Sequence, residues 1–196
     1  MTKQAQTDHP VHALIADRWS PYSFADRDLP DAELRSLLEA ARWAASSYNE
    51  QPWSFLVAKR DDPQAFEQML SCLVEGNQAW AKAVPVLVLT VVSRDFQRNG
   101  KPNAAAAHDI GLAVGNLSLE ATARGIALHQ MIGILPDRAR EVYEVPESHD
   151  VLTGLAIGYA VEPDALSDRE KSPRQRKSLS EFVFSGRWGE ASPLVS

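Results

Sequence analysis

The chain has 196 residues, of which 44% are hydrophobic and 23% charged, as is typical of one globular domain with a substantial core. Its formal net charge of −6 argues against a nucleic-acid-binding protein, which normally carries a basic face. The single cysteine, Cys72, excludes an intrachain disulfide and favours a reducing compartment. The polar first ten residues lack the apolar segment of a signal peptide, so we expect a cytoplasmic protein.

The hydrophobic pattern predicts helices and strands that interleave along the chain. Spacings of three and four residues between apolar side chains, clearest at Leu34, Leu37, Leu38 and Ala41, indicate helices. Short apolar runs rich in β-branched residues indicate strands. The helices are predicted within residues 11–17, 29–45, 63–73, 103–124 and 136–143. The strands are predicted at residues 53–59, 85–93 and 151–161, and residues 127–134 fit either a strand or a turn.

The longest predicted helix, residues 103–124, is apolar on more than one side. Such a helix either lies at the centre of a domain or faces a partner chain. The interleaving lacks the strict alternation of a doubly wound fold. We therefore expect a single α+β domain in which helices cover a central sheet. After residue 161 the chain becomes strongly charged and is expected to be irregular.

Several common chemical signatures are missing from the sequence. The five histidines show no metal-ligand spacing, and one cysteine cannot form a zinc site. Neither of the two glycine-rich phosphate motifs occurs, and no G-x-S-x-G elbow is present. We therefore expect no metal site and no nucleophilic dyad.

Two separated segments carry arginines suited to an anion. In "DRWSPYSF", Arg18 and Ser20 stand at a corner that the following proline keeps from being helical. In "SPRQRKS", Arg174 and Arg176 alternate, so an extended chain would direct both to one side. Two planar guanidinium groups on one side suit a phosphate. The alternative is that both segments are simply solvated surface.

The segment "AASSYNEQPW" concentrates hydrogen-bonding groups directly before a predicted strand. Ser46, Ser47, Asn49 and Gln51 could bind a polar ligand. Because serine, asparagine and proline also mark ordinary helix-to-strand loops, a purely structural loop remains the alternative.

These motifs occur together, in an order that resembles the nitroreductase-like FMN-dependent flavoproteins. The resemblance rests on "RWS", "SSYNEQPW", "GNQAW", "HDIGLAVGNLSLEATARGIA", "IGYAVEP" and "RQRKSLSEFV". It runs over residues 11–183, nearly the whole chain. It implies a mostly antiparallel sheet covered by helices, in a homodimer whose subunits share each active site.

The resemblance also implies how the cofactor is held. Arg18 and Ser20, with Trp19 between them, would bind the FMN phosphate from one side, and Arg174 and Arg176 would close on it from the tail. The polar loop would contact the ribityl chain or the flavin edge, and the backbone of residues 130–133 would pass beside the ring and donate to its N5. The cofactor-binding residues expected on this basis are Arg18, Trp19, Ser20, Tyr22, Ser46, Ser47, Asn49, Asn77, Gln130, Met131, Ile132, Gly133, Arg174 and Arg176. No catalytic side chain and no metal ligand is expected.

One position departs from the family pattern. Two residues after Ser20, where relatives usually carry Arg or Lys, this chain has Tyr22. That position normally reaches the pyrimidine end of the flavin, where negative charge collects on reduction. A phenol can donate a hydrogen bond but brings no fixed positive charge, so we expect a lower flavin potential or another donor.

The activity implied is transfer of a hydride from NAD(P)H through bound FMN to a small acceptor, such as a nitroaromatic or a quinone, by a ping-pong reaction. A non-enzymatic flavin or nucleotide binder or sensor, or a family variant that catalyses dehydrogenation or dehalogenation, is the alternative. Residues 1–10 are expected to be a flexible N-terminus, residues 11–183 the FMN-binding domain and residues 184–196 a C-terminal extension. Neither nucleic acid nor membrane is expected as a partner.

Overall fold

The computed structural model describes residues 3–195. Its sheet has four strands in the order β1-β2-β4-β3, and every neighbouring pair is antiparallel. The strands are β1 (Trp53–Lys59), β2 (Val86–Ser93), β3 (Ala127–Met131) and β4 (His149–Gly158). The expected α+β domain with an antiparallel sheet is thus confirmed, and residues 127–134 begin as a strand.

The two inner strands account for the most apolar parts of the sequence. All eight residues of β2 are buried, and β2 pairs with β1 on one side and β4 on the other. A strand covered on both faces cannot alternate polar and apolar residues. The predicted central strand at residues 85–93 is therefore correct to within one residue.

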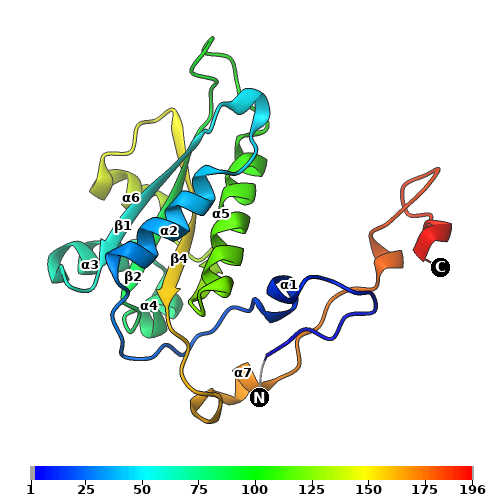
Figure 1. Ribbon diagram of the computed structural model, residues 1–196. Coiled ribbons are helices and arrows are strands. Elements are labelled where there is room, and N and C mark those ends of the chain that lie inside the picture. The colour runs from blue at the N-terminus through cyan, green and yellow to red at the C-terminus, as the bar shows by residue number, and fades with distance from the viewer. Residues whose placement is uncertain (1–2, 196) are drawn as a thin grey trace.

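Helices cover both faces of this sheet (Figure 1). The α-helices are α1 (Ala13–Asp17), α2 (Asp31–Arg42), α3 (Pro63–Leu70), α4 (Glu75–Ala81), α5 (Ala106–Ala123), α6 (Pro136–Tyr143) and α7 (Asp168–Lys171). On one face, α2 and α5 pack against β2 and β4 around Leu37, Leu117 and Leu155, which are fully buried. On the other face, α3, α4 and α6 pack around Met69, Leu73 and Leu89.

The longest helix, α5, ends where its sequence suggests. Gly125 follows it with φ of +68°, a left-handed conformation that suits glycine and ends a helix. Its start lies three residues later than expected, because Asn103 donates its backbone amide to Arg94 and its side chain accepts from the amide of Ala105. The helices α4 and α7 were not predicted, and α7 lies in the segment after residue 161 that was expected to be irregular.

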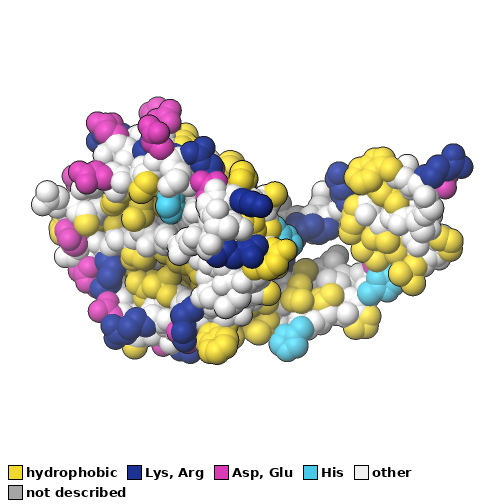
Figure 2. Space-filling view, turned by 90° about the horizontal axis from the view of Figure 1, so that it is seen from above, with side chains coloured by type: hydrophobic (Ala, Val, Ile, Leu, Met, Phe, Trp, Pro, Cys, Tyr) yellow, Lys and Arg dark blue, Asp and Glu magenta, His cyan; other side chains and the backbone are white. Residues whose placement is uncertain are grey.

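The C-terminal segment, residues 182–195, stands apart from the sheet and its covering helices (Figures 1 and 2). Its large side chains are strongly exposed, with Phe182 at 55%, Leu194 at 86% and Trp188 at 93%. The predicted division into residues 1–10, 11–183 and 184–196 stays a prediction. Within residues 3–195 no helix has the length and apolar character needed to cross a membrane.

Candidate anion-binding and active site

The corner at "DRWSPYSF" is fixed to the end of the sheet. Helix α1 ends at Asp17, and the backbone of Arg18, the next residue, is extended. Phe24 then forms an isolated bridge with Ala160, just after β4, and Ala25 donates its amide to the carbonyl of Tyr159. The corner therefore lies beside the segment that leaves β4 toward the tail.

A buried carboxylate joins the corner to the tail, the part of the chain that follows β4. Glu170, on α7, is only 4% exposed. Its carboxylate accepts hydrogen bonds from the amides of Tyr22 and Ser23 at 2.7 and 3.0 Å and from the Ser23 hydroxyl at 2.6 Å. The amide and hydroxyl of Ser167 also donate to it, closing a capping box at the start of α7.

These hydrogen bonds explain the protonation state of Glu170. Burial by itself would raise its pKa, because a charged group loses hydration. The hydrogen bonds from Ser167, Ser23 and Tyr22 favour the ionised form and together lower the pKa to about 2. Glu170 is thus a stable anion whose oxygens are already engaged by the protein.

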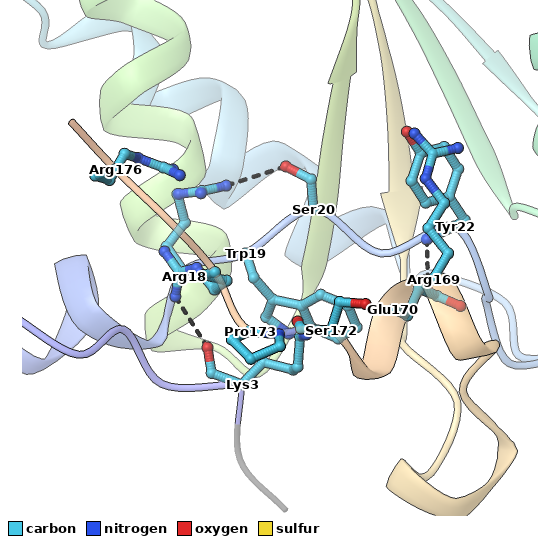
Figure 3. Close-up of a pocket in the computed structure, with 11 residues that line it drawn as sticks. Lys3, Arg18, Trp19, Ser20, Tyr22, Arg169, Glu170, Ser172, Pro173 and Arg176 are labelled. Atoms are coloured by element: carbon cyan, nitrogen blue, oxygen red, sulfur yellow. Dashed lines mark hydrogen bonds between the residues drawn. The ribbon is translucent and has the colours of Figure 1, made fainter.

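A pocket of about 460 Å³ lies where the corner meets the tail, a volume within the usual range for small-molecule sites. Arg18, Trp19, Ser20 and Tyr22 line it from the corner. The segment after β4 contributes Arg169, Glu170, Ser172, Pro173, Arg174 and Arg176, and Lys3 comes from the irregular N-terminal segment. Figure 3 shows Arg18 and Arg176 toward one end of this pocket and Tyr22 with Arg169 toward the other.

The arginine end of the pocket is strongly positive. Arg18 donates to the Ser20 hydroxyl at 3.2 Å (Figure 3). Arg174 donates to the carbonyls of Lys3 and Ala16. Over residues 3–195, no carboxylate forms an ion pair with Arg18, Arg174 or Arg176. Like charges held together without a counter-ion favour binding of an anion.

Burial and the neighbouring positive charges lower the pKa values of Arg18 and Arg174. Burial lowers the pKa of Arg18, and the positive charges of Arg174 and Arg176 lower it further. The pKa of Arg174 is lowered by burial and by Arg176, although Asp17 opposes the shift. A phosphate placed among these groups would relieve their repulsion and accept charge-assisted hydrogen bonds.

Aromatic rings extend the site beyond the arginines. The ring of Tyr22 meets the edges of His129 and Trp80 at centroid distances of 4.5 and 5.2 Å. The guanidinium of Arg169 lies over the Tyr22 ring, with its Cζ 4.1 Å from the ring centroid. Tyr22 therefore connects the pocket to residues of β3 and α4.

His129 is a neutral member of this cluster. Its Nδ1 lies 2.7 Å from the carbonyl oxygen of Pro21. Burial lowers its pKa, the bond to Pro21 opposes the shift, and the charges of Arg169 and Arg18 add to it. Neutral imidazole can bond that carbonyl only if Nδ1 carries the proton, so His129 donates to Pro21 and holds the corner.

Asn77 is linked to the same cluster. Its Oδ1 accepts from the indole of Trp80 at 3.3 Å, and its Nδ2 donates to the carbonyl of Gly133 at 2.9 Å. A Cβ at Gly133 would lie 2.4 Å from that Nδ2, a distance that real side chains do not tolerate. Glycine at this position is what allows α4 to approach the segment after β3 so closely.

The remaining residues of the predicted backbone segment point in different directions. Met131 is buried in the core at 6% exposure, whereas Ile132 is 82% exposed. Gln130 donates to the hydroxyl of Ser118 on α5 at 3.1 Å. The segment after β3 therefore has a solvent-exposed side, on which Ile132 lies.

The polar loop within residues 44–53 lies away from the pocket of its own chain. Ser46, Ser47 and Asn49 are absent from the pocket lining, and Ser47 donates its amide to Asp109 in the first turn of α5. Figure 1 shows this loop, between α2 and β1, at the end of the molecule opposite α7. One chain therefore brings together the corner and the tail but not the loop.

Five residues of the pocket lining were not predicted from the sequence: the charged residues Lys3, Arg169 and Glu170, together with Ser172 and Pro173. For Glu170 a local signal exists, because Ser167 and Glu170 have the spacing of a capping box. No pattern in the sequence distinguishes Arg169 or Lys3 from solvated charges.

The chain is similar to known proteins over most of its length. A protein of 15.4 kDa from Mycolicibacterium smegmatis is 32% identical over 130 residues, which cover 64% of this chain and 86% of the relative. A Streptomyces coelicolor protein, named for NADH dehydrogenase and NAD(P)H nitroreductase activity, is 28% identical over 182 residues, or 83% of this chain and 87% of its own.

Among solved structures, one described as an oxidoreductase containing FMN superposes with a TM-score of 0.87 at 34% identity. The match covers 95% of this chain and 96% of that one. The model of the nitroreductase family matches residues 15–159, from α1 to the end of β4. Since that match takes in the whole sheet and most of its helices, the chain belongs to the nitroreductase family.

Proposed function

We propose that the protein is an FMN-dependent oxidoreductase that takes electrons from NAD(P)H. The observation that carries this proposal is the cluster of Arg18, Arg174 and Arg176, which share one pocket and lack carboxylate partners among residues 3–195. Such a cluster fits a phosphate dianion. In the proposed complex Arg18, Ser20, Arg174 and Arg176 hold the phosphate of FMN, and Trp19 packs beside it.

The other end of the pocket suits an aromatic ring system. Tyr22 lines the pocket and contacts Trp80 and His129. Through Trp80 and Asn77 this cluster reaches Gly133. We propose that the flavin ring lies along this line, with Asn77 and the backbone of residues 130–133 at its polar edge.

The polar loop is proposed to act on the partner's cofactor. Ser46, Ser47 and Asn49 lie away from their own pocket, so a second copy of the chain must supply them if they bind FMN. The solvent side of α5 offers a surface for that copy, because Leu112 is 40% exposed and a Cβ at Gly111 or Gly115 would meet no atom within 4 Å. An apolar helix face with small residues packs readily against a second helix.

Bound FMN supplies the redox chemistry itself, by accepting a hydride from a nicotinamide and giving it up to an acceptor. The side chains bind and orient the cofactor and leave one face of the ring open. This explains why the sequence contains no catalytic dyad. We propose a ping-pong reaction in which NAD(P)H leaves before a small acceptor, such as a nitroaromatic or a quinone, enters.

The visible absorbance spectrum tests this function directly. We expect the purified protein to show a flavin spectrum that bleaches when NADPH or NADH is added without oxygen, and whose colour returns when a quinone is supplied. A protein that is colourless and does not take up FMN would overturn the proposal. A flavin spectrum that persists with both nicotinamides would favour a flavin-binding protein without this activity.

A further inference from the structure

The pocket contains a second positive centre, separate from the arginine cluster at its other end. Arg169 lines the pocket together with Tyr22, and Figure 3 shows these two side chains together, away from Arg18 and Arg176. In the part of the chain that the structure describes, 3–195, Arg169 takes part in none of the ion pairs. Its charge is therefore available to a ligand.

The fold holds Arg169 in this place through the neighbouring residue. The Glu170 carboxylate accepts a hydrogen bond from the amide of Tyr22 at 2.7 Å. This bond fixes α7 to the backbone of Tyr22, the residue whose ring Arg169 covers. The guanidinium lies 4.1 Å from the centroid of that ring. Stacking on an aromatic face fixes the guanidinium plane and leaves its N–H donors free at the edge.

We propose that Arg169 is the cation that stabilises the ring of bound FMN in its reduced, anionic form. This inference rests on the function proposed above. FMN carries negative charge in two places: always on its phosphate, and on the pyrimidine part of its ring after reduction. The pocket likewise has two positive centres, with the arginine cluster at one end and Arg169 over Tyr22 at the other.

This assignment resolves the departure at Tyr22. The phenol brings no fixed charge to the flavin, but its ring is the platform on which Arg169 lies. The pair Tyr22–Arg169 thus replaces a single basic side chain. A lower flavin potential, one of the two outcomes expected from the sequence, is then avoided, because the positive charge comes from a residue 147 positions further along the chain, in direct contact with the position that lacks it.

The midpoint potential of bound FMN tests the assignment. Replacing Arg169→Gln removes the charge from an exposed side chain, so the fold should be preserved. We expect oxidised FMN to bind with little change and reduced FMN to bind about tenfold more weakly. For a two-electron couple that ratio lowers the potential by about 30 mV. Arg169→Lys, which keeps the charge, should stay nearer to the original value.

Lys171→Gln is the matched control, because it removes the same charge from the same short helix at a residue outside the lining of this pocket. An unchanged potential in Arg169→Gln, or an equal shift in Lys171→Gln, would overturn the inference. Equal weakening of oxidised and reduced FMN would also overturn it and would assign Arg169 to the phosphate. If the unaltered protein binds no FMN, the proposed function fails first and the inference fails with it.

Discussion

The Glu170 carboxylate accepts the backbone amide of Tyr22 at 2.7 Å across 148 residues of sequence. This contact joins the corner after α1 to the tail after β4, and the arginines that line the pocket come from these two segments. The shape of the anion site thus depends on a side chain whose own oxygens accept hydrogen bonds from amides and hydroxyls of the protein.

The first prediction concerns the stability of this junction. Glu170→Gln keeps the size of the side chain but replaces one acceptor oxygen by an NH2 donor, which then faces amides and hydroxyls that also donate. We expect a loss of about 1–3 kcal/mol in the free energy of unfolding, the usual cost of leaving buried groups unsatisfied. Urea denaturation measures it. Glu162→Gln, at an exposed carboxylate, should change little; equal stability of both variants would contradict the role of Glu170.

The second prediction is the pH dependence of that difference. The folded-state pKa of Glu170, about 2, lies below the ordinary value of 4.5. A carboxyl with a lowered pKa stabilises the fold above its unfolded-state pKa, and this contribution is lost as the pH falls toward the folded-state pKa. The stability gap between the original protein and Glu170→Gln should therefore be constant from neutral pH to about 5 and shrink between about 4.5 and 2. Denaturation at a series of pH values checks this, and a gap that widens on acidification would refute it.

The third prediction separates the phosphate contacts from the ring contacts. Arg18→Ala should weaken FMN binding by about tenfold to a hundredfold, since hydrogen bonds to charged groups are worth about 1.5–3 kcal/mol. Riboflavin, which lacks the phosphate, should bind both proteins alike. Flavin fluorescence titration measures both ligands. Arg35→Ala removes an exposed arginine of α2 and serves as the control. Equal losses for FMN and riboflavin would place the phosphate elsewhere.

The fourth prediction concerns the partner subunit. Leu112→Glu places a charge on the exposed face of α5, where we expect the second copy to pack. The variant should be monomeric in sedimentation experiments and should lose FMN affinity, because the loop with Ser46, Ser47 and Asn49 would no longer reach a neighbouring pocket. Gln64→Glu on α3, at another exposed position, should leave both properties unchanged. A monomer that binds FMN as tightly as the original protein would show that one chain completes its own site.

Much of the fold could be predicted from the sequence, because its strands and long helices are local patterns. Residues 53–59 were expected as a strand and form β1 over Trp53–Lys59. The helix α4 was missed because it is only seven residues long and contains Gly76 and Asn77, which have low helix propensity. Its stability comes from packing on the sheet, as the full burial of Ala81 indicates.

The candidate site was predictable in part. The sequence led us to expect that one anion is shared by Arg18, Ser20, Arg174 and Arg176. In the structure these four residues line one pocket. The arrangement of Tyr22 under Arg169 was not foreseen, since a tyrosine and a distant arginine carry no mutual signal in one sequence. Their contact exists only because Glu170, next to Arg169, binds the backbone of Tyr22.

The sequence by itself therefore determined the order of the strands and of the longer helices, the family resemblance and the residues able to bind an anion, since these follow from periodicity and residue chemistry within short windows. The tertiary structure decided which charges meet. It brought the corner and the tail together, left the loop with Ser46 and Ser47 at the far end of the molecule, and placed Arg169 over Tyr22. The physical reason is that burial and hydrogen bonding between segments some 150 residues apart depend on how the sheet and its helices pack, and no local pattern records that packing.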